Sequence, residues 1–118
     1  MKVAINTCYG GFALSYYAFE LLLARKGIDF EKEDTSRLMG PHYYHAGLPH
    51  TDENYISEYS FYDDRADSDL IAVIEQLRDD ADGWATEIDI VEIPDDVKWH
   101  IEEHDGWEHV AEDHRTWR

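Results

Sequence analysis

The sequence is poor in basic residues and in cysteine, and both shortages exclude whole classes of protein. Its 118 residues contain 10 Lys and Arg against 27 Asp and Glu, which gives a formal net charge of −17. Because general affinity for DNA, RNA or anionic membranes needs clustered cations, we expect neither a nucleic-acid polymer nor a membrane surface as a partner. The single cysteine, Cys8, excludes an internal disulfide framework.

Long apolar runs are also missing. No segment approaches the length of a transmembrane helix, and Met1-Lys2-Val3 leads into a strand rather than into a signal peptide, so we expect a cytosolic protein. Hydrophobic residues still make up 43% of the chain and aromatic residues 14%, enough for one modest core in a single domain over residues 1–118. The acidity fits a protein that repels nucleic acid, a protein from a saline habitat or a DNA mimic.

The first half of the chain predicts one strand and one helix. Residues 2–7 alternate like a strand, Ser15 is a good helix N-cap, and apolar residues then recur at helical spacing until Gly27 ends the helix. Residues 31–49 carry Gly and Pro among polar residues, which predicts a loop with at most a short strand. An extended segment is expected over residues 55–62.

The second half predicts a helix and three strands. Asp67 can cap a helix that ends in the acidic run before Gly83, and residues 88–93 form a β-branched strand. Residues 97–102 alternate like a strand, Asp105-Gly106 favours a two-residue turn, and residues 107–116 return as its partner. A short helix over 107–116 remains the alternative. The predicted class is therefore α+β, a small mixed and largely antiparallel sheet with two helices and a C-terminal β-hairpin.

The opening segment KVAINTCYGGFALS, residues 2–15, holds the first candidate site. Gly10 and Gly11 follow a strand and precede a helix, and two glycines at such a turn allow positive φ and close backbone approach to a ligand. The N–H groups at the start of the helix favour an anion. Purely connecting turns use the same pattern, so this anion site is one of two interpretations.

Seven histidines suggest a metal site, but the pattern favours a simpler explanation. His100 to His104 spells H-x-x-E-H, which binds zinc only on a helix, and here it lies in a segment with strand periodicity. On a strand His100, Glu102 and His104 share a face, which leaves a partial site possible. Because no other catalytic constellation stands out, we expect no enzyme and no cofactor, and exposed histidines among carboxylates are the default.

The scarce arginines and nearby aromatic residues suggest a binding function. Arg65 precedes the second helix, and Arg115 stands next but one to Trp117 near the end of the sequence. An arginine can contact a phosphate through its forked guanidinium, while an aromatic ring stacks on a base. The alternative is that Arg115 and Trp117 attach the terminus to the core.

Several motifs together resemble a family of small phage proteins, the first type of Thoeris anti-defence protein. The resemblance is carried by Ile5 to Phe12, by Arg65 with Asp67 and the Asp69-Leu70-Ile71 string, and by a C-terminal set. That set is Glu92 to Val97, Trp99, Asp105-Gly106 and His114-Arg115-Thr116-Trp117. Residues 31–60 do not match, and the acidity and the histidine-rich central loop depart from the family pattern.

The resemblance implies a non-enzymatic sponge in the cytoplasm of an infected bacterial host. It implies that the protein encloses a cyclised ADP-ribose signal or a cyclic oligonucleotide, as a homodimer or a larger closed homo-oligomer with ligand at the subunit contacts. Combined with the residue chemistry, it predicts a ligand site at Tyr9, Gly10, Gly11, Phe12, Arg65, Arg115 and Trp117. An acidic DNA mimic that blocks a restriction or CRISPR complex and a metal-dependent nucleotide hydrolase remain the alternatives.

Overall fold

The computed structural model describes residues 1–36 and 40–113, and these form an α+β fold, as predicted. Within them lie two α-helices, α1 (Tyr16–Arg25) and α2 (Ser68–Leu77), and three two-stranded antiparallel sheets. The sheets pair β1 (Lys2–Asn6) with β4 (Ile88–Glu92), β2 (Phe30–Ser36) with β3 (Gly40–His45), and β5 (Trp99–His104) with β6 (Trp107–Glu112). Short 3-10 helices cover Asp52–Asn54, Glu58–Phe61 and Arg78–Ala81.

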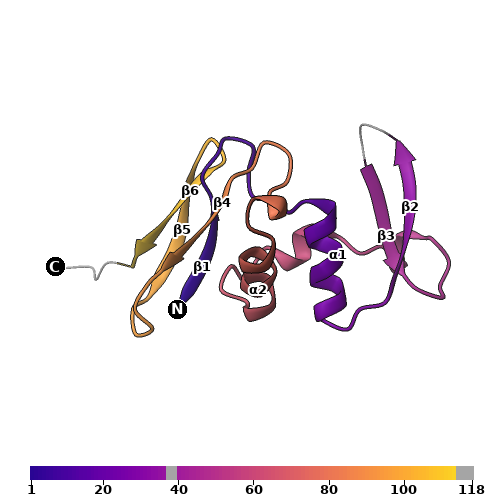
Figure 1. Cartoon of the computed structure of the whole chain (residues 1–118), viewed down its shortest axis with the longest axis horizontal. Coiled ribbons are helices and arrows are strands. Elements are labelled where there is room, and N and C mark those ends of the chain that lie inside the picture. The colour runs from indigo at the N-terminus through magenta and orange to yellow at the C-terminus, as the bar shows by residue number, and fades with distance from the viewer. Residues whose placement is uncertain (37–39, 114–118) are drawn as a thin grey trace.

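The elements follow one another along an elongated body of 55 × 30 × 26 Å (Figure 1). The β5–β6 hairpin and the β1–β4 pair occupy one end, the two helices occupy the middle, and the β2–β3 hairpin forms the other end. β1 and β4 lie next to α2, and Ala4 pairs with Ile90 in their register. No helix in the described part of the chain combines the length and apolar character needed to span a membrane.

The core lies where the two helices face each other. Phe19, Leu22 and Leu23 of α1 and Leu70 and Val73 of α2 are almost completely buried. Their spacing places them on the inner face of each helix, as the apolar periodicity predicts.

Both predicted N-caps are confirmed. The Ser15 hydroxyl accepts a hydrogen bond from the Ala18 N–H at 3.2 Å, and the Asp67 carboxylate accepts one from the Leu70 N–H at 3.0 Å. These bonds satisfy donors that have no partner inside the helix. The Asp105-Gly106 turn is also confirmed, because both residues have positive φ and join β5 to β6 as a two-residue hairpin.

Three details of the prediction are wrong. The strands form three separate pairs rather than one sheet, residues 30–36 and 40–45 form two paired strands rather than a loop with at most a short strand, and residues 55–62 contain a 3-10 helix rather than an extended segment. The sequence Phe-Glu-Lys-Glu-Asp-Thr-Ser of β2 shows no apolar alternation, since Glu31 to Asp34 are all exposed. A strand without a buried face carries no period-two signal.

Candidate functional site

The glycine corner, Gly10-Gly11, packs against the turn that precedes β4. The Gly10 N–H donates to the Ala85 carbonyl at 2.9 Å, and a Cβ on Gly10 would lie 2.1 Å from that oxygen. Gly11 has φ +83° with open space around its Cα hydrogens. Gly10 is thus required by the close approach of two backbones, and its N–H already has a partner within the protein.

The start of α1 lies after this corner rather than directly on it. Residues 12–15 separate Gly11 from the first helical residue, Tyr16, and Ser15 caps the helix. The first turn of α1 holds no acidic side chain, so no residue of the helix's own first turn offsets its positive end.

A cavity of about 400 Å³ connects these two features, and we call it the Trp84 pocket. Its walls are Gly10, residues 13–16, Glu58-Tyr59 and residues 82–84. Three of the aromatic side chains are unusually exposed, Trp84 at 91%, Tyr59 at 69% and Tyr16 at 49%. A pocket of this size with accessible ring faces suits a small planar ligand.

Hydrogen bonds fix the turn that carries Trp84. The Gly83 N–H donates to the Ala13 carbonyl at 2.9 Å, and the Thr86 hydroxyl donates to the Gly11 carbonyl at 2.8 Å. The turn is therefore held against the glycine corner on both sides of Trp84, while the indole itself remains in solvent.

The pocket carries negative charge. Burial raises the pKa of Glu58, and burial together with the nearby Asp79 and Glu87 carboxylates raises the pKa of Asp82. No Lys, Arg or His among the described residues lines this pocket. An anionic group entering it must rely on backbone donors at the start of α1.

Arg65, a predicted ligand residue, lies in a buried network instead of in the pocket. Its guanidinium forms two hydrogen bonds with the Glu108 carboxylate, at 2.7 and 3.0 Å, and donates to the Tyr62 carbonyl at 2.7 Å. The Arg65 side chain is 13% exposed and that of Glu108 7%. The Arg65 Cζ atom also lies 3.8 Å from the centre of the Phe12 ring.

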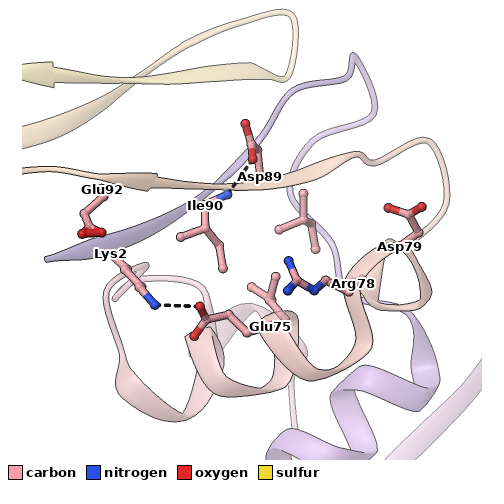
Figure 2. Close-up of a pocket in the computed structure, with 9 residues that line it drawn as sticks. Lys2, Glu75, Arg78, Asp79, Asp89, Ile90 and Glu92 are labelled. Carbon is pink, nitrogen blue, oxygen red and sulfur yellow. Dashed lines mark hydrogen bonds and ion pairs between the residues drawn. The ribbon is translucent and has the colours of Figure 1, made fainter.

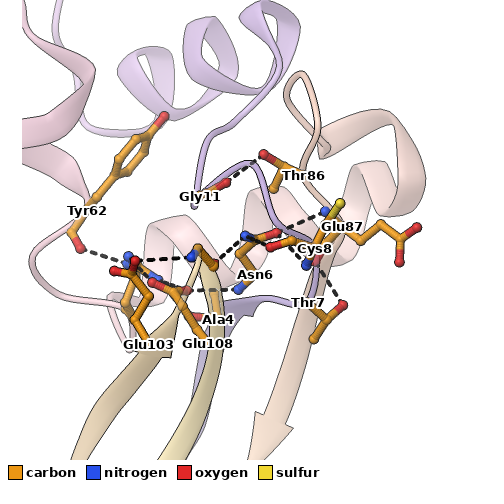
Figure 3. A network of polar contacts seen from close by, with 12 residues as sticks. Ala4, Asn6, Thr7, Cys8, Gly11, Tyr62, Thr86, Glu87, Glu103 and Glu108 are labelled. Carbon is orange, nitrogen blue, oxygen red and sulfur yellow. Dashed lines mark hydrogen bonds and ion pairs between the residues drawn. The ribbon is translucent and has the colours of Figure 1, made fainter.

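Asn6 completes this network at the end of β1. Its amide nitrogen donates to the carbonyls of Cys8 (2.6 Å) and Gly106 (2.7 Å), and its oxygen accepts from the N–H groups of Cys8 and Glu87, both at 3.1 Å. The Asn6 N–H donates to Glu108 at 2.9 Å. Figure 3 shows the Asn6 side chain beside the backbone of Cys8 and Glu87, with Glu108 of β6 next to it.

The other predicted site residues are placed as follows. Phe12 is buried, and its ring contacts Arg65 and Tyr62. Tyr9 is exposed and packs edge-on against Trp107, with ring centres 5.4 Å apart, and it does not line the Trp84 pocket. Arg115 and Trp117 lie outside the described residues. Of the predicted set, Gly10 alone lines the pocket within the described chain.

The pocket's aromatic residues were missed by the sequence reasoning. Trp84 stands between Gly83 and Ala85 in an acidic stretch with no large apolar residue beside it, and that isolation was an available signal of exposure. Tyr59 and Tyr16 lie within apolar segments and gave no such signal.

A second cavity, the Arg78 groove, lies between α2 and the β1–β4 pair (Figure 2). It has a volume of about 410 Å³, and the carboxylates of Glu75, Asp79, Asp89 and Glu92 surround Lys2 and Arg78. Lys2 is paired with Glu75 at 2.7 Å, so the groove offers an anion little net positive charge.

The histidines pair with carboxylates on the surface. On the β5–β6 hairpin, His100 bonds Asp113 and also Glu102 (3.0 Å), and Glu102 bonds His109 (2.8 Å). His50 similarly lies between Glu31 and Glu33 and stacks on Tyr44. Across the described residues, no group of three or more His, Cys, Asp or Glu side chains has the arrangement to hold a metal ion. His100 and His104 lie on a strand, as the periodicity predicts.

Comparisons of the chain with models of protein families, with curated proteins and with solved structures find no match.

Proposed function

We propose that this protein captures a cyclised ADP-ribose-type immune signal, or a cyclic oligonucleotide, and sequesters it without converting it, in the cytoplasm of an infected bacterial host. The observation that carries the proposal is the Trp84 pocket, where the glycine corner, the start of α1 and three exposed aromatic rings face one cavity of about 400 Å³.

The base and the phosphate of a nucleotide each find a matching group in this pocket. The Trp84, Tyr59 and Tyr16 rings supply faces on which a base can stack, which contributes about 1–3 kcal/mol per base in proteins that bind single strands. Ser15 occupies the Ala18 N–H, and the N–H groups of the first turn of α1 that precede it favour a phosphate, as helix N-termini generally do.

Additional positive charge has to come from few sources. Five of the described basic side chains form ion pairs, namely Lys2, Arg25, Lys26, Lys32 and Arg65. Arg78 and Lys98 have no carboxylate partner among the described residues, and neither lines the Trp84 pocket. Arg115, one of the three arginines outside the described residues, remains our proposed contact to the phosphates, with Trp117 as an additional stacking residue.

Sequestration also requires enclosure. Trp84 is 91% exposed in the single chain, so one copy covers only part of a ligand. A second copy that packs over this pocket would desolvate both the rings and the ligand, and we propose a homodimer or larger closed homo-oligomer for that reason.

The test is capture followed by release. The protein is incubated with cyclised ADP-ribose, separated from free ligand, and heated, and the released molecule is identified by mass spectrometry. A sponge releases the molecule intact, a hydrolase releases product, and a DNA mimic retains nothing. Recovery of product or of no ligand would overturn the proposal.

The charged contact is tested by Arg115→Glu in calorimetry. We expect at least a tenfold loss of affinity with an unchanged circular dichroism spectrum, because a charge-assisted hydrogen bond contributes about 1.5–3 kcal/mol. Lys98→Glu is the matched control, since it makes the same change of charge at an exposed position outside the pocket. Equal affinity in Arg115→Glu and Lys98→Glu would remove Arg115 from the site.

A further inference from the structure

Two carboxylates line the Trp84 pocket beside the aromatic rings. Glu58 belongs to the 3-10 helix Glu58–Phe61, and Asp82 directly precedes the Gly83-Trp84 turn. Both side chains are partly buried, and no basic side chain of the described chain lines the pocket with them. Stacking of a flat ring on aromatic side chains does not require charged residues in the pocket, so stacking alone does not explain these two carboxylates.

Each carboxylate has one oxygen engaged and one oxygen open. One Glu58 oxygen accepts from the Tyr62 hydroxyl at 3.4 Å, and that hydroxyl in turn accepts from the Leu14 N–H at 3.0 Å. Asp82 Oδ1 accepts from the Ile88 N–H at 2.9 Å. The remaining oxygens, Glu58 Oε1 and Asp82 Oδ2, form no hydrogen bond with a described residue. The engaged oxygens therefore fix the two carboxylates to the protein and leave acceptors available to a ligand.

An ionised carboxylate only accepts hydrogen bonds, so this arrangement is selective. It repels phosphate oxygens and stabilises a group that presents N–H or O–H donors, and the bond is strengthened because the acceptor is charged. A nucleotide carries O–H donors on its ribose and N–H donors on its base edge, and a base stacked on the aromatic residues of this pocket brings its exocyclic amino group to the carboxylates.

We propose that the Trp84 pocket takes the base of its ligand, with Glu58 and Asp82 accepting from an exocyclic amino group, so that amino-bearing bases such as adenine are selected. The phosphates then lie near the start of α1 and away from the Glu58 and Asp82 carboxylates. This inference rests on the proposed function, because it names the base chemistry that the same site recognises.

The experiment compares two nucleosides that differ only in the amino group. Adenosine and purine riboside, which has hydrogen in place of the 6-amino group, compete with labelled cyclised ADP-ribose for the protein. We expect adenosine to compete at least about tenfold better, because the lost bond has a charged acceptor. Glu58→Gln and Asp82→Asn should each reduce this ratio several-fold, whereas Glu53→Gln, an exposed carboxylate outside the pocket, should leave it unchanged.

The outcomes separate the two proposals. If cyclised ADP-ribose does not bind, the proposed function fails and the base selectivity fails with it. If it binds while the two nucleosides compete equally, or while adenosine does not compete, the selectivity alone is overturned. A ratio that Glu53→Gln lowers as much as Glu58→Gln also overturns it, provided that circular dichroism shows both variants folded.

Discussion

Removing the Glu108 carboxylate should destabilise this fold more than removing any exposed acidic side chain. Glu108→Ala leaves the Arg65 guanidinium, 13% exposed, without its counter-ion. The same change removes the acceptor of the buried Asn6 N–H. Breaking a buried ion pair by deleting one partner costs about 3–5 kcal/mol, because the charge that remains is still desolvated.

That loss is large for a chain of this size. Unfolding entropy of about 2.1 cal/mol/K per residue gives about 0.25 kcal/mol/K for 118 residues, so about 4 kcal/mol corresponds to about 16 °C in Tm. Total stability of such domains is about 5–15 kcal/mol, so this loss removes roughly a quarter to four fifths of the free energy of unfolding.

The assay is urea unfolding followed by circular dichroism, with thermal melts beside it. Glu112→Ala is the matched control, since Glu112 is exposed on the same strand β6 and should change stability by less than about 0.5 kcal/mol. The double variant Arg65→Met with Glu108→Leu removes both charges together. It should recover the part of the loss that comes from the unpaired Arg65 charge, because replacing a buried pair by apolar residues is often neutral, but not the part that comes from the Asn6 N–H, which still lacks its acceptor.

Two results would refute this reasoning. A loss below about 1 kcal/mol in Glu108→Ala would mean that water reaches the pair, and a double variant as unstable as the single one would mean that the charges are not coupled. A stable double variant also tests Arg65 as a ligand residue. If it binds cyclised ADP-ribose normally, Arg65 acts in the framework alone.

Two further predictions concern the glycine corner and the hairpin histidine. Gly10→Ala should lower the free energy of unfolding in urea by about 2 kcal/mol or more, because its Cβ would lie 2.1 Å from a carbonyl oxygen. Gly11→Ala, in open space with φ +83°, should lower it by about 1 kcal/mol. Equal losses in the two variants would contradict the steric account. Hydrogen bonds to Glu102 and Asp113 raise the pKa of His100, so its contribution to stability is complete below its ordinary pKa and is lost as pH rises through the raised value. His100→Asn should therefore lower Tm more at about pH 6 than at about pH 9, and a loss that is independent of pH would show that the charge of His100 does not stabilise the fold.

The helices and the C-terminal hairpin were predictable because their signals are local. Ser15 and Asp67 mark helix starts by side-chain chemistry that acts within three residues, and Asp105-Gly106 suits a turn that needs positive φ twice. The β2–β3 hairpin was not predictable in this way. Its strands lie at one end of the molecule and have few buried positions, so their sequences lack the alternation of apolar and polar residues that predicts a strand.

The candidate site was only partly predictable for a related reason. The Trp84 pocket joins segments near residues 10–16, 58–59 and 82–84, which no spacing rule brings together. Gly10 was identified because a glycine pair after a strand is a local signal. The carboxylates were not identified, because among 27 acidic residues nothing in the sequence distinguishes Glu58 or Asp82 from those that are simply solvated.

The motif residues that suggested a family have framework contacts in this structure. Asn6 bonds to Cys8 and Gly106, and Arg65 stacks on Phe12 while it pairs with the β6 carboxylate. A resemblance carried by such residues reports first on how the backbone turns are joined, since each is needed for folding whatever the ligand. Under the proposed function, the choice of ligand also depends on Glu58, Asp82 and the aromatic residues of the pocket, which the motifs do not include. The nucleoside competition and the variants of the pocket carboxylates therefore test the choice of ligand more directly than a substitution at Asn6 or Arg65.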